Sequence, residues 1–170
     1  AEAAAAAVEQ IAATAHGYNG FNLVAGERAA ATFASNRATA SRALPVGISG
    51  LSNAGLDTPW PKLVRAKAGV AAWVASGSDD LDALLGVLND RDVAPDGMLP
   101  DTGLARERER LLSSPFIVSD DYGTRSSTVF ALARDGAALF VERTFNAAGE
   151  ITGDVEYRFR LAADQRADAA

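Results

Sequence analysis

The sequence of 170 residues predicts a single α+β domain with a largely antiparallel sheet and two central helices on one side. Two central segments carry apolar residues at helical spacing, whereas strand-like runs in the C-terminal half are separated by turn signals. No repeat of fixed period and no long linker divides the chain. A chain of this length buries about 70% of its unfolded surface, which is enough for one hydrophobic core.

An alanine-rich segment over residues 3–15 predicts a helix that covers a sheet lightly, because Val8 and Ile11 are its only large apolar anchors. His16, the single histidine, follows this segment and precedes Gly17. A cation is favoured at the C-terminal end of the helix dipole, and glycine commonly ends a helix. This position favours a role for His16 at the helix end over a role in catalysis.

Three strands are predicted next. Residues 21–26 and 29–36 flank a two-residue turn and predict a hairpin. Residues 46–53 predict a third strand that ends at Asn53 and contains glycines where the backbone passes close to another element. The side chains expected to be buried by this strand are those of Val46, Ile48 and Leu51.

Two helices follow the predicted strands. The first begins at Pro59 or Pro61 and ends near Ala75, and proline suits a first turn whose N–H groups have no intrahelical partner. Its apolar face consists of Leu63, Ala66, Val70, Trp73 and Val74. Ser78 is expected to cap a shorter helix with acidic residues in its first turn. The apolar face of that helix consists of Leu81, Leu84, Leu85 and Leu88.

The segment 89–103 is rich in Asp, Pro and Gly and predicts a loop. Calcium binding is disfavoured there, because Asp90 and Asp92 are not followed by a third ligand and a glycine at the EF-hand positions. Residues 105–112 predict a short charged helix with a solvated face.

Strands are predicted over most of the remaining chain, and the last residues, ADQRADAA, are expected to form a frayed tail. The Asp135-Gly136 pair predicts a hairpin turn, and residues 146–153 predict a longer loop. The predicted strands are 116–119, 124–134, 137–146 and 154–161.

Charge and composition exclude several classes of protein. The net charge of −6 and the isoelectric point near 4.8 disfavour nucleic acid as a partner, and no apolar run approaches the roughly 18 residues of a membrane span. The chain has no cysteine and one histidine, so we expect no zinc site and no other cofactor. The N-terminus has Glu2 and Glu9 and no basic region, unlike a signal peptide, and we expect a cytoplasmic protein.

Two segments contain candidate functional residues. In GLSNAGLDTPWPK (50–62), Asn53 and Gly55 could form a turn, Asp57 or Thr58 could cap the helix, and Trp60 could fill the core. Alternatively, the Asn53 carboxamide at a strand end suits oxyanion stabilisation or substrate anchoring. In DDYGTRSSTVF (120–130), Arg125 could pair with a carboxylate or phosphate, or could be a surface arginine on an edge strand.

Several segments, taken together and in order, resemble the NRDE family, also called the transport and Golgi organisation protein 2 family. The resemblance extends from Tyr18 to Leu161. GLSN followed by LDTPWPK is its most specific part. The other segments are YNGFNLVAG (18–26), SNR (35–37), LPDTG (99–103), SPFI (114–117), YGTRSSTVF (122–130) and FVERTF (140–145).

The resemblance implies an N-terminal-nucleophile-hydrolase-like fold, which is an αββα sandwich. Family chains begin with Met-Cys and then carry an Asn-Arg-Asp-Glu motif, and neither feature is in this sequence. We therefore expect residues 1–170 to be one N-terminally truncated family domain. The nucleophile would lie in upstream sequence, and this chain alone is expected to be inactive, because Ala1 has no nucleophilic side-chain atom.

The resemblance also implies roles for individual residues. LSN (51–53) is similar to the segment of related acylases whose asparagine binds the developing oxyanion, which nominates Asn53. TRSST (124–128) is similar to a segment whose arginine orients the catalytic cysteine, which nominates Arg125. Asp57, Trp60 and Lys62 match the family's motif, but the resemblance transfers no established role to them. We nevertheless expect substrate to be bound by Asp57, Trp60, Lys62 and Tyr122, with Lys62 facing either solvent or an anionic ligand.

Three hypotheses for the function follow. The first is an amide hydrolase or acyltransferase of the N-terminal-nucleophile type, acting on a small molecule or an acyl ligand. The second is a non-catalytic binding or trafficking protein for acyl-coenzyme A, lipid or haem, because eukaryotic family members are linked to Golgi organisation and secretion. Haem is the weakest of these ligands, since His16 is the single histidine. The third is a structural fragment without its own activity.

Overall fold

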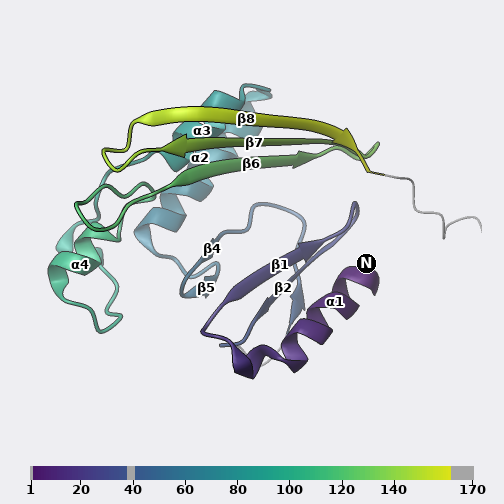
Figure 1. Ribbon diagram of the computed structural model, residues 1–170, viewed down its shortest axis with the longest axis horizontal. Coiled ribbons are helices and arrows are strands. Elements are labelled where there is room, and N and C mark those ends of the chain that lie inside the picture. Colours follow the sequence, from purple (N-terminus) through teal and green to yellow (C-terminus); the bar gives the residue numbers. More distant parts are fainter. Residues whose placement is uncertain (1, 38–40, 162–170) are drawn as a thin grey trace, which may run out of the picture.

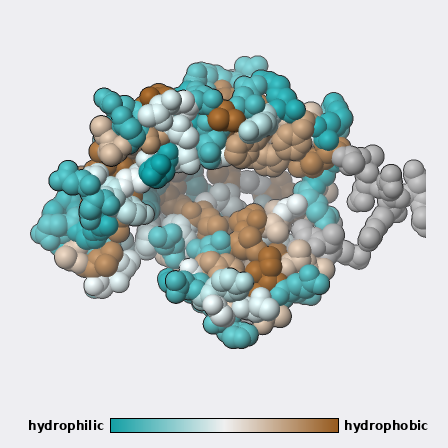
Figure 2. Space-filling view, viewed as in Figure 1, coloured by the Kyte–Doolittle hydropathy of each residue, from teal (hydrophilic) through white to brown (hydrophobic). Residues whose placement is uncertain are grey.

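The computed structural model describes residues 2–37 and 41–161 and confirms an α+β architecture with antiparallel sheets. The described strands form three sheets, in the orders β1-β2-β3, β4-β5 and β6-β7-β8. Helix α1 covers the outer side of the β1–β2 layer, and α2 and α3 lie behind the β6–β8 layer (Figure 1). Figure 2 shows a hollow between these two layers, with hydrophobic residues along it.

The N-terminal layer has the predicted helix and hairpin, but the predicted two-residue turn is wrong, because β1 ends at Gly26 and β2 begins at Ala31, which leaves a longer loop over residues 27–30. Val8 is fully buried where α1 packs on β1 and β2. His16 lies in a short 3₁₀ helix (Ala15–Gly17) directly after α1, as predicted. At the hairpin tip, Arg28 donates a hydrogen bond of 3.4 Å to the carbonyl of Leu161, which links this layer to the end of β8. The bounds are α1 Glu2–Ala13, β1 Asn22–Gly26, β2 Ala31–Ser35 and β3 Arg42–Ala43.

The predicted strand 46–53 is largely wrong. Only β4 (Leu51–Ser52) forms, and it pairs with β5 (Gly55–Leu56) in a short hairpin. At Gly50 the backbone passes so close to helix α2 that an added Cβ would lie 2.8 Å from Leu63. The chain therefore bends across the helix where a strand would have to continue. The three side chains expected to be buried, Val46, Ile48 and Leu51, are all exposed.

Helix α2 (Pro61–Ser76) begins and ends close to the predicted residues. Pro61 occupies the first turn, as expected, and Gly77 ends the helix with a left-handed φ of 64°. The expected cap by Asp57 or Thr58 is wrong, because Trp60 precedes the helix and no side chain caps it.

Helix α3 (Leu81–Leu88) is capped by Asp80, whose carboxylate accepts hydrogen bonds from the amides of Asp82 and Ala83. The predicted cap, Ser78, is wrong because it lies two residues before the cap Asp80, and its hydroxyl accepts a hydrogen bond from the Asp80 amide and from no amide of the helix. Of the predicted leucine stripe, Leu85 is the residue that is fully buried.

Replacing Asp80 with alanine should lower the free energy of unfolding by about 1 kcal/mol, because two amides of the first turn lose their acceptor. Urea unfolding followed by circular dichroism measures this change. Asp79→Ala is the matched control, since it removes a neighbouring carboxylate without removing a cap. Equal losses in the two variants would contradict the assignment of the cap.

The C-terminal half contains three of the four predicted strands. They are β6 (Ser126–Leu132), β7 (Ala137–Phe145) and β8 (Ile151–Arg160). The predicted hairpin turn between β6 and β7 is confirmed, with Gly136 at a φ of 88°. The predicted strand 116–119 is reduced to one bridge between Val118 and Gly123. Strand β8 begins earlier than predicted, so the preceding loop is shorter.

The loop 89–103 is irregular except for one 3₁₀ turn, and α4 (Arg106–Leu111) follows it as predicted. Phe116 anchors the chain after α4, since it is 1% exposed and contacts Phe145 edge-to-face at 4.7 Å. The predicted tail lies outside the described residues. No helix within residues 2–37 and 41–161 has the length and apolar character needed to cross a bilayer.

Candidate ligand-binding cleft

A cleft of about 1050 Å³ lies where α2 begins, between the β4–β5 turn and α4. This volume is at the upper end of the range of small-molecule pockets. Asn53, Trp60, Lys62 and Tyr122, four of the six predicted site residues, line it. Its other lining residues are Arg37, Ala54, Pro61, Pro100, Asp101, Thr102, Leu104, Arg108, Glu109, Leu112, Ser113 and Ile117.

The β4–β5 hairpin holds Asn53 at the rim of the cleft. Asn53 and Ala54 form the turn between the paired residues Ser52 and Gly55. The carbonyl of Ser52 accepts a hydrogen bond of 2.9 Å from the Asn22 side chain, which fixes the hairpin to β1. The Asn53 carboxamide is exposed and forms no hydrogen bond with the described residues. Both its donor and its acceptor therefore remain available to a ligand.

The first turn of α2 places Trp60 and Lys62 in the cleft wall. The Lys62 ammonium donates a hydrogen bond of 2.8 Å to the carbonyl of Leu112 and lies 5.6 Å from the centre of the Trp60 ring. Burial lowers the pKa of Lys62, and the nearby Glu109 carboxylate opposes part of this effect. Among the described residues, no carboxylate forms an ion pair with Lys62.

Glu109 contradicts the expectation that α4 is a solvated charged helix. Its side chain is 4% exposed, and Oε1 accepts hydrogen bonds from the amide and the hydroxyl of Thr102, at 2.8 and 2.5 Å. These hydrogen bonds hold the pKa of Glu109 below its usual value. The loop at Thr102 folds back over α4, which buries one face of a short helix that sequence patterning predicts to be exposed. Glu109 thereby fixes this loop as a wall of the cleft.

Two arginines that sequence reasoning did not nominate complete the charged lining. The Arg108 guanidinium lies 5.1 Å above the Tyr122 ring and 3.4 Å from a carboxylate oxygen of Asp121. Arg37 follows β2 and packs against Gly20, where a Cβ would collide with the guanidinium. Arg37 belongs to the SNR segment (35–37), which is part of the family resemblance, so the sequence did contain a signal for it. No signal marked Arg108, since the alternating charges of ARERER are typical of a solvated helix.

The other two predicted site residues lie outside the cleft lining. Asp57 has a left-handed φ of 56°, and its carboxylate accepts hydrogen bonds from the Gly50 amide at 2.9 Å and from Lys67 at 2.5 Å. The hydrogen bond from Lys67 holds the pKa of Asp57 below its usual value, and the contacts of Asp57 close the turn before α2. Arg125 is exposed, and its carbonyl accepts a hydrogen bond from the Phe145 amide.

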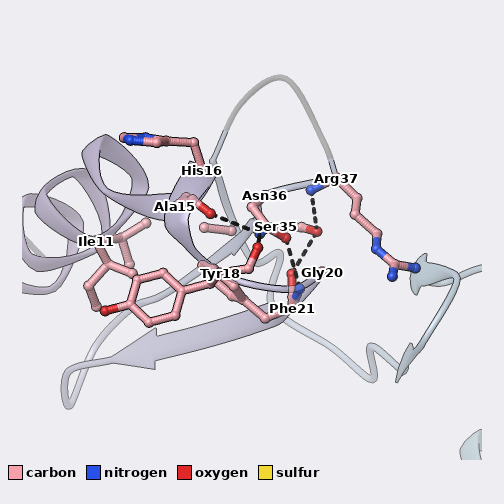
Figure 3. Close-up of a pocket in the computed structure, with 11 residues that line it drawn as sticks. Ile11, Ala15, His16, Tyr18, Gly20, Phe21, Ser35, Asn36 and Arg37 are labelled. Carbon is pink, nitrogen blue, oxygen red and sulfur yellow. Dashed lines mark hydrogen bonds between the residues drawn. The ribbon is translucent and has the colours of Figure 1, made fainter.

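A second pocket of about 610 Å³ lies between α1 and the first sheet (Figure 3). Its polar centre is Asn36, whose amide nitrogen donates to the carbonyls of Ala15 and Asn19 and whose oxygen accepts from the Phe21 amide. The Asn36 side chain is therefore occupied in fixing the loop that leads to β1. Arg37 extends away from this pocket in Figure 3, and it also lines the larger cleft.

The fold and the cleft define an α+β protein with antiparallel sheets and an aromatic, cationic concave site. Comparison with protein families matches residues 1–147 to Transport and Golgi organisation 2. The chain belongs to this family, which confirms the resemblance found in the sequence.

Curated relatives agree with this assignment. The Transport and Golgi organization protein 2 homolog of Bos taurus is 35% identical over 153 residues, covering 81% of this chain and 55% of the relative. The homolog of Homo sapiens is 35% identical over 143 residues, covering 76% and 52%. The Mus musculus homolog is 30% identical over 151 residues, covering 81% and 55%. The chain thus spans about half the length of the curated relatives it matches.

Proposed function

We propose that the cleft binds a small acyl ligand with an anionic head group, of the acyl-coenzyme A class. The observation that carries this proposal is Lys62, a half-buried ammonium in a concave site without an ion-pair partner among the described residues. A charge that has lost part of its hydration interacts more strongly with an incoming anion than a solvated charge does.

The charge of the lining supports an anionic ligand. Three cations, Arg37, Lys62 and Arg108, line the cleft, although the whole chain has a net charge of −6. The two lining carboxylates have partners of their own. Glu109 accepts hydrogen bonds from Thr102, and Asp101 accepts one of 3.3 Å from the Gly103 amide. Phosphates or a carboxylate of a ligand would meet three lining cations against two lining carboxylates, and Arg108 also lies 3.4 Å from an oxygen of Asp121.

The apolar part of the lining supports an acyl chain on the same ligand. Trp60 and Tyr122 offer aromatic surfaces, and Leu104, Leu112 and Ile117 offer aliphatic ones. Asn53 at the rim could hydrogen-bond the carbonyl of an amide or thioester. The relatives are named for transport and Golgi organization, and a role in transport is the part of those names that we extend to this chain.

The same position of Asn53 supports, as a second candidate, the amide hydrolase or acyltransferase implied by the family resemblance. In that reaction the unpaired carboxamide would donate to the oxyanion. The sequence contains no cysteine, so the thiol nucleophile of that mechanism would have to come from outside these 170 residues. We therefore rank ligand binding above catalysis for the chain described.

Isothermal titration calorimetry with octanoyl-coenzyme A tests the proposal and its pH dependence together. Binding requires the protonated form of Lys62, so affinity should be constant at neutral pH and fall as pH rises through the pKa of this lysine. Because burial lowers that pKa, the loss should begin below the usual value of 10.5. Above pH 7.5 the phosphates of the ligand no longer titrate, since their second pKa is about 6.

Two comparisons make this titration decisive. Octanoate and coenzyme A alone should each bind more weakly than the conjugate, because each fills only part of the cleft. The variant Lys62→Arg should bind without the loss at alkaline pH, since arginine stays protonated. An absence of binding by the wild-type chain at neutral pH, or an unchanged alkaline loss in the arginine variant, would contradict the proposal.

A further inference from the structure

Strand β8 is a long free edge. In the order β6-β7-β8 it has a neighbour on one side only within the described part of the chain, and it borders its layer in Figure 1. All ten residues from Ile151 to Arg160 are exposed. The strand contains no proline to block further pairing. A long edge of this kind presents unpaired backbone donors and acceptors that can bind another strand.

The two faces of β8 differ sharply in chemistry. Alternation along the strand places four charged residues on the face toward α3, where Asp154 bonds Arg143 and Arg143 in turn bonds Asp82. On the opposite face, Tyr157 contacts Phe140 and Phe159 stacks on Phe130, with ring centres 6.2 and 6.4 Å apart. The charged residues are Asp154, Glu156, Arg158 and Arg160.

We propose that β8 pairs antiparallel with β8 of a second copy of this chain, with Tyr157 on the two-fold axis. In this register Glu156 lies opposite Arg158 of the other copy, and Asp154 lies opposite Arg160. The two-fold axis repeats both pairs, so four pairs of opposite charge line one face. On the other face Tyr157 meets its own copy, and Val155 meets Phe159. Opposite charges and aromatic pairs across strands are the contacts that stabilise a sheet.

The alternative registers are less favourable. A shift of the register by an odd number of residues would place the apolar residues of one copy and the charged residues of the other on the same face of the joined sheet. Centring on Glu156 or on Arg158 would place like charges directly opposite each other. Centring on Val155 would set Asp154 against Glu156, and centring on Phe159 would set Arg158 against Arg160. The pattern DVEYRFR is thus self-complementary in one register.

Within residues 2–37 and 41–161, the central pair, Glu156 and Arg158, has no ion-pair partner on another strand. These two residues bond each other along the strand, with Arg158 Nε 2.5 Å from Glu156 Oε1. Pairing of two copies would exchange this contact, present once in each copy, for two cross-strand ion pairs. It would also join the two three-stranded sheets into one with a continuous apolar face.

Charge reversal tests the proposal. Glu156→Lys alone and Arg158→Glu alone should each place like charges opposite each other and shift the mass measured by light scattering from two chains to one. An equimolar mixture of these variants should restore the dimer, because each lysine then faces a glutamate. The double variant Glu156→Lys, Arg158→Glu should dimerise by itself. A wild type that stays monomeric at all concentrations, or a mixture that fails to recover dimers, would overturn the proposal.

Disulfide trapping tests the register independently, since the chain contains no cysteine. Tyr157→Cys should form a covalent dimer on oxidation, because residue 157 faces itself across the two-fold axis within disulfide range. Val155→Cys is the matched control and should not cross-link with itself, whereas its mixture with Phe159→Cys should. Efficient self-linkage of the Val155 variant would contradict the register, even if the protein is dimeric.

Discussion

Replacing Phe116 with alanine should lower the free energy of unfolding by about 3–5 kcal/mol, the range for deleting a buried aromatic side chain. Phe116 is 1% exposed, lies edge-to-face on Phe145, and has the Arg91 guanidinium 4.7 Å from its ring centre. Gly149 also packs here, since a Cβ at that position would lie 3.1 Å from the ring. The ring therefore joins the segment after α4 to the end of β7, and alanine would leave a cavity.

Urea denaturation followed by circular dichroism measures the effect of Phe116→Ala. Phe130→Ala is the matched control, since it removes the same side chain from a position that is 55% exposed. Phe130→Ala should lower the free energy of unfolding much less, because the folded protein buries little of this side chain. A loss for Phe116→Ala no larger than for the control would contradict our assignment of Phe116 to the core.

Replacing Lys62 with methionine should weaken octanoyl-coenzyme A binding by about 10- to 100-fold at neutral pH. The change removes the half-buried ammonium and keeps a side chain of similar length. A hydrogen bond to a charged group contributes roughly 1.5–3 kcal/mol, and each 1.4 kcal/mol is about a factor of ten in affinity. Titration calorimetry measures this loss. The affinity for octanoate should fall less than the affinity for the conjugate, because octanoate lacks the head group that Lys62 is proposed to bind.

Arg134→Ala is the matched control for this experiment, because it removes an exposed cation that does not line the cleft. Its effect on affinity should be within a factor of two or so, as expected for a screened surface charge. The thermal midpoint of Lys62→Met should stay close to that of the wild type, since the variant also removes a desolvated charge. Equal affinity in both variants would remove Lys62 from the proposed site.

Local patterning predicted most of the regular elements. Helices α2 and α3 follow from apolar residues at helical spacing, and the β6–β7 turn follows from Asp135-Gly136. The residue that caps α3 was harder to predict, because Ser78 and Asp80 are both residue types that cap helices. Only the backbone geometry selects Asp80. The strand predicted over 46–53 was wrong because its hydrophobic pattern says nothing of α2, which approaches at Gly50.

The candidate site was predictable where residues belong to one motif. Asn53, Trp60 and Lys62 lie within thirteen residues of GLSNAGLDTPWPK, so one turn and one helix start bring them together. Asp57, from the same motif, binds Lys67 and Gly50 in the turn because its backbone conformation directs it there. Arg37 and Arg108 come from distant segments, and their position beside Lys62 depends on how the layers pack.

The sequence by itself determined the α+β class, the net negative charge and the absence of cysteine from these 170 residues, because these depend on composition and on local periodicity. Its ordered motifs indicated the family. Only the tertiary structure decided that Glu109 is buried, that three cations line one cleft, and that β8 is an edge strand among the described residues. These features arise from contacts between residues far apart in the chain. Such contacts leave no regular spacing in the sequence that could predict them. The packing of the layers decides which charges are buried and which charges lie next to each other.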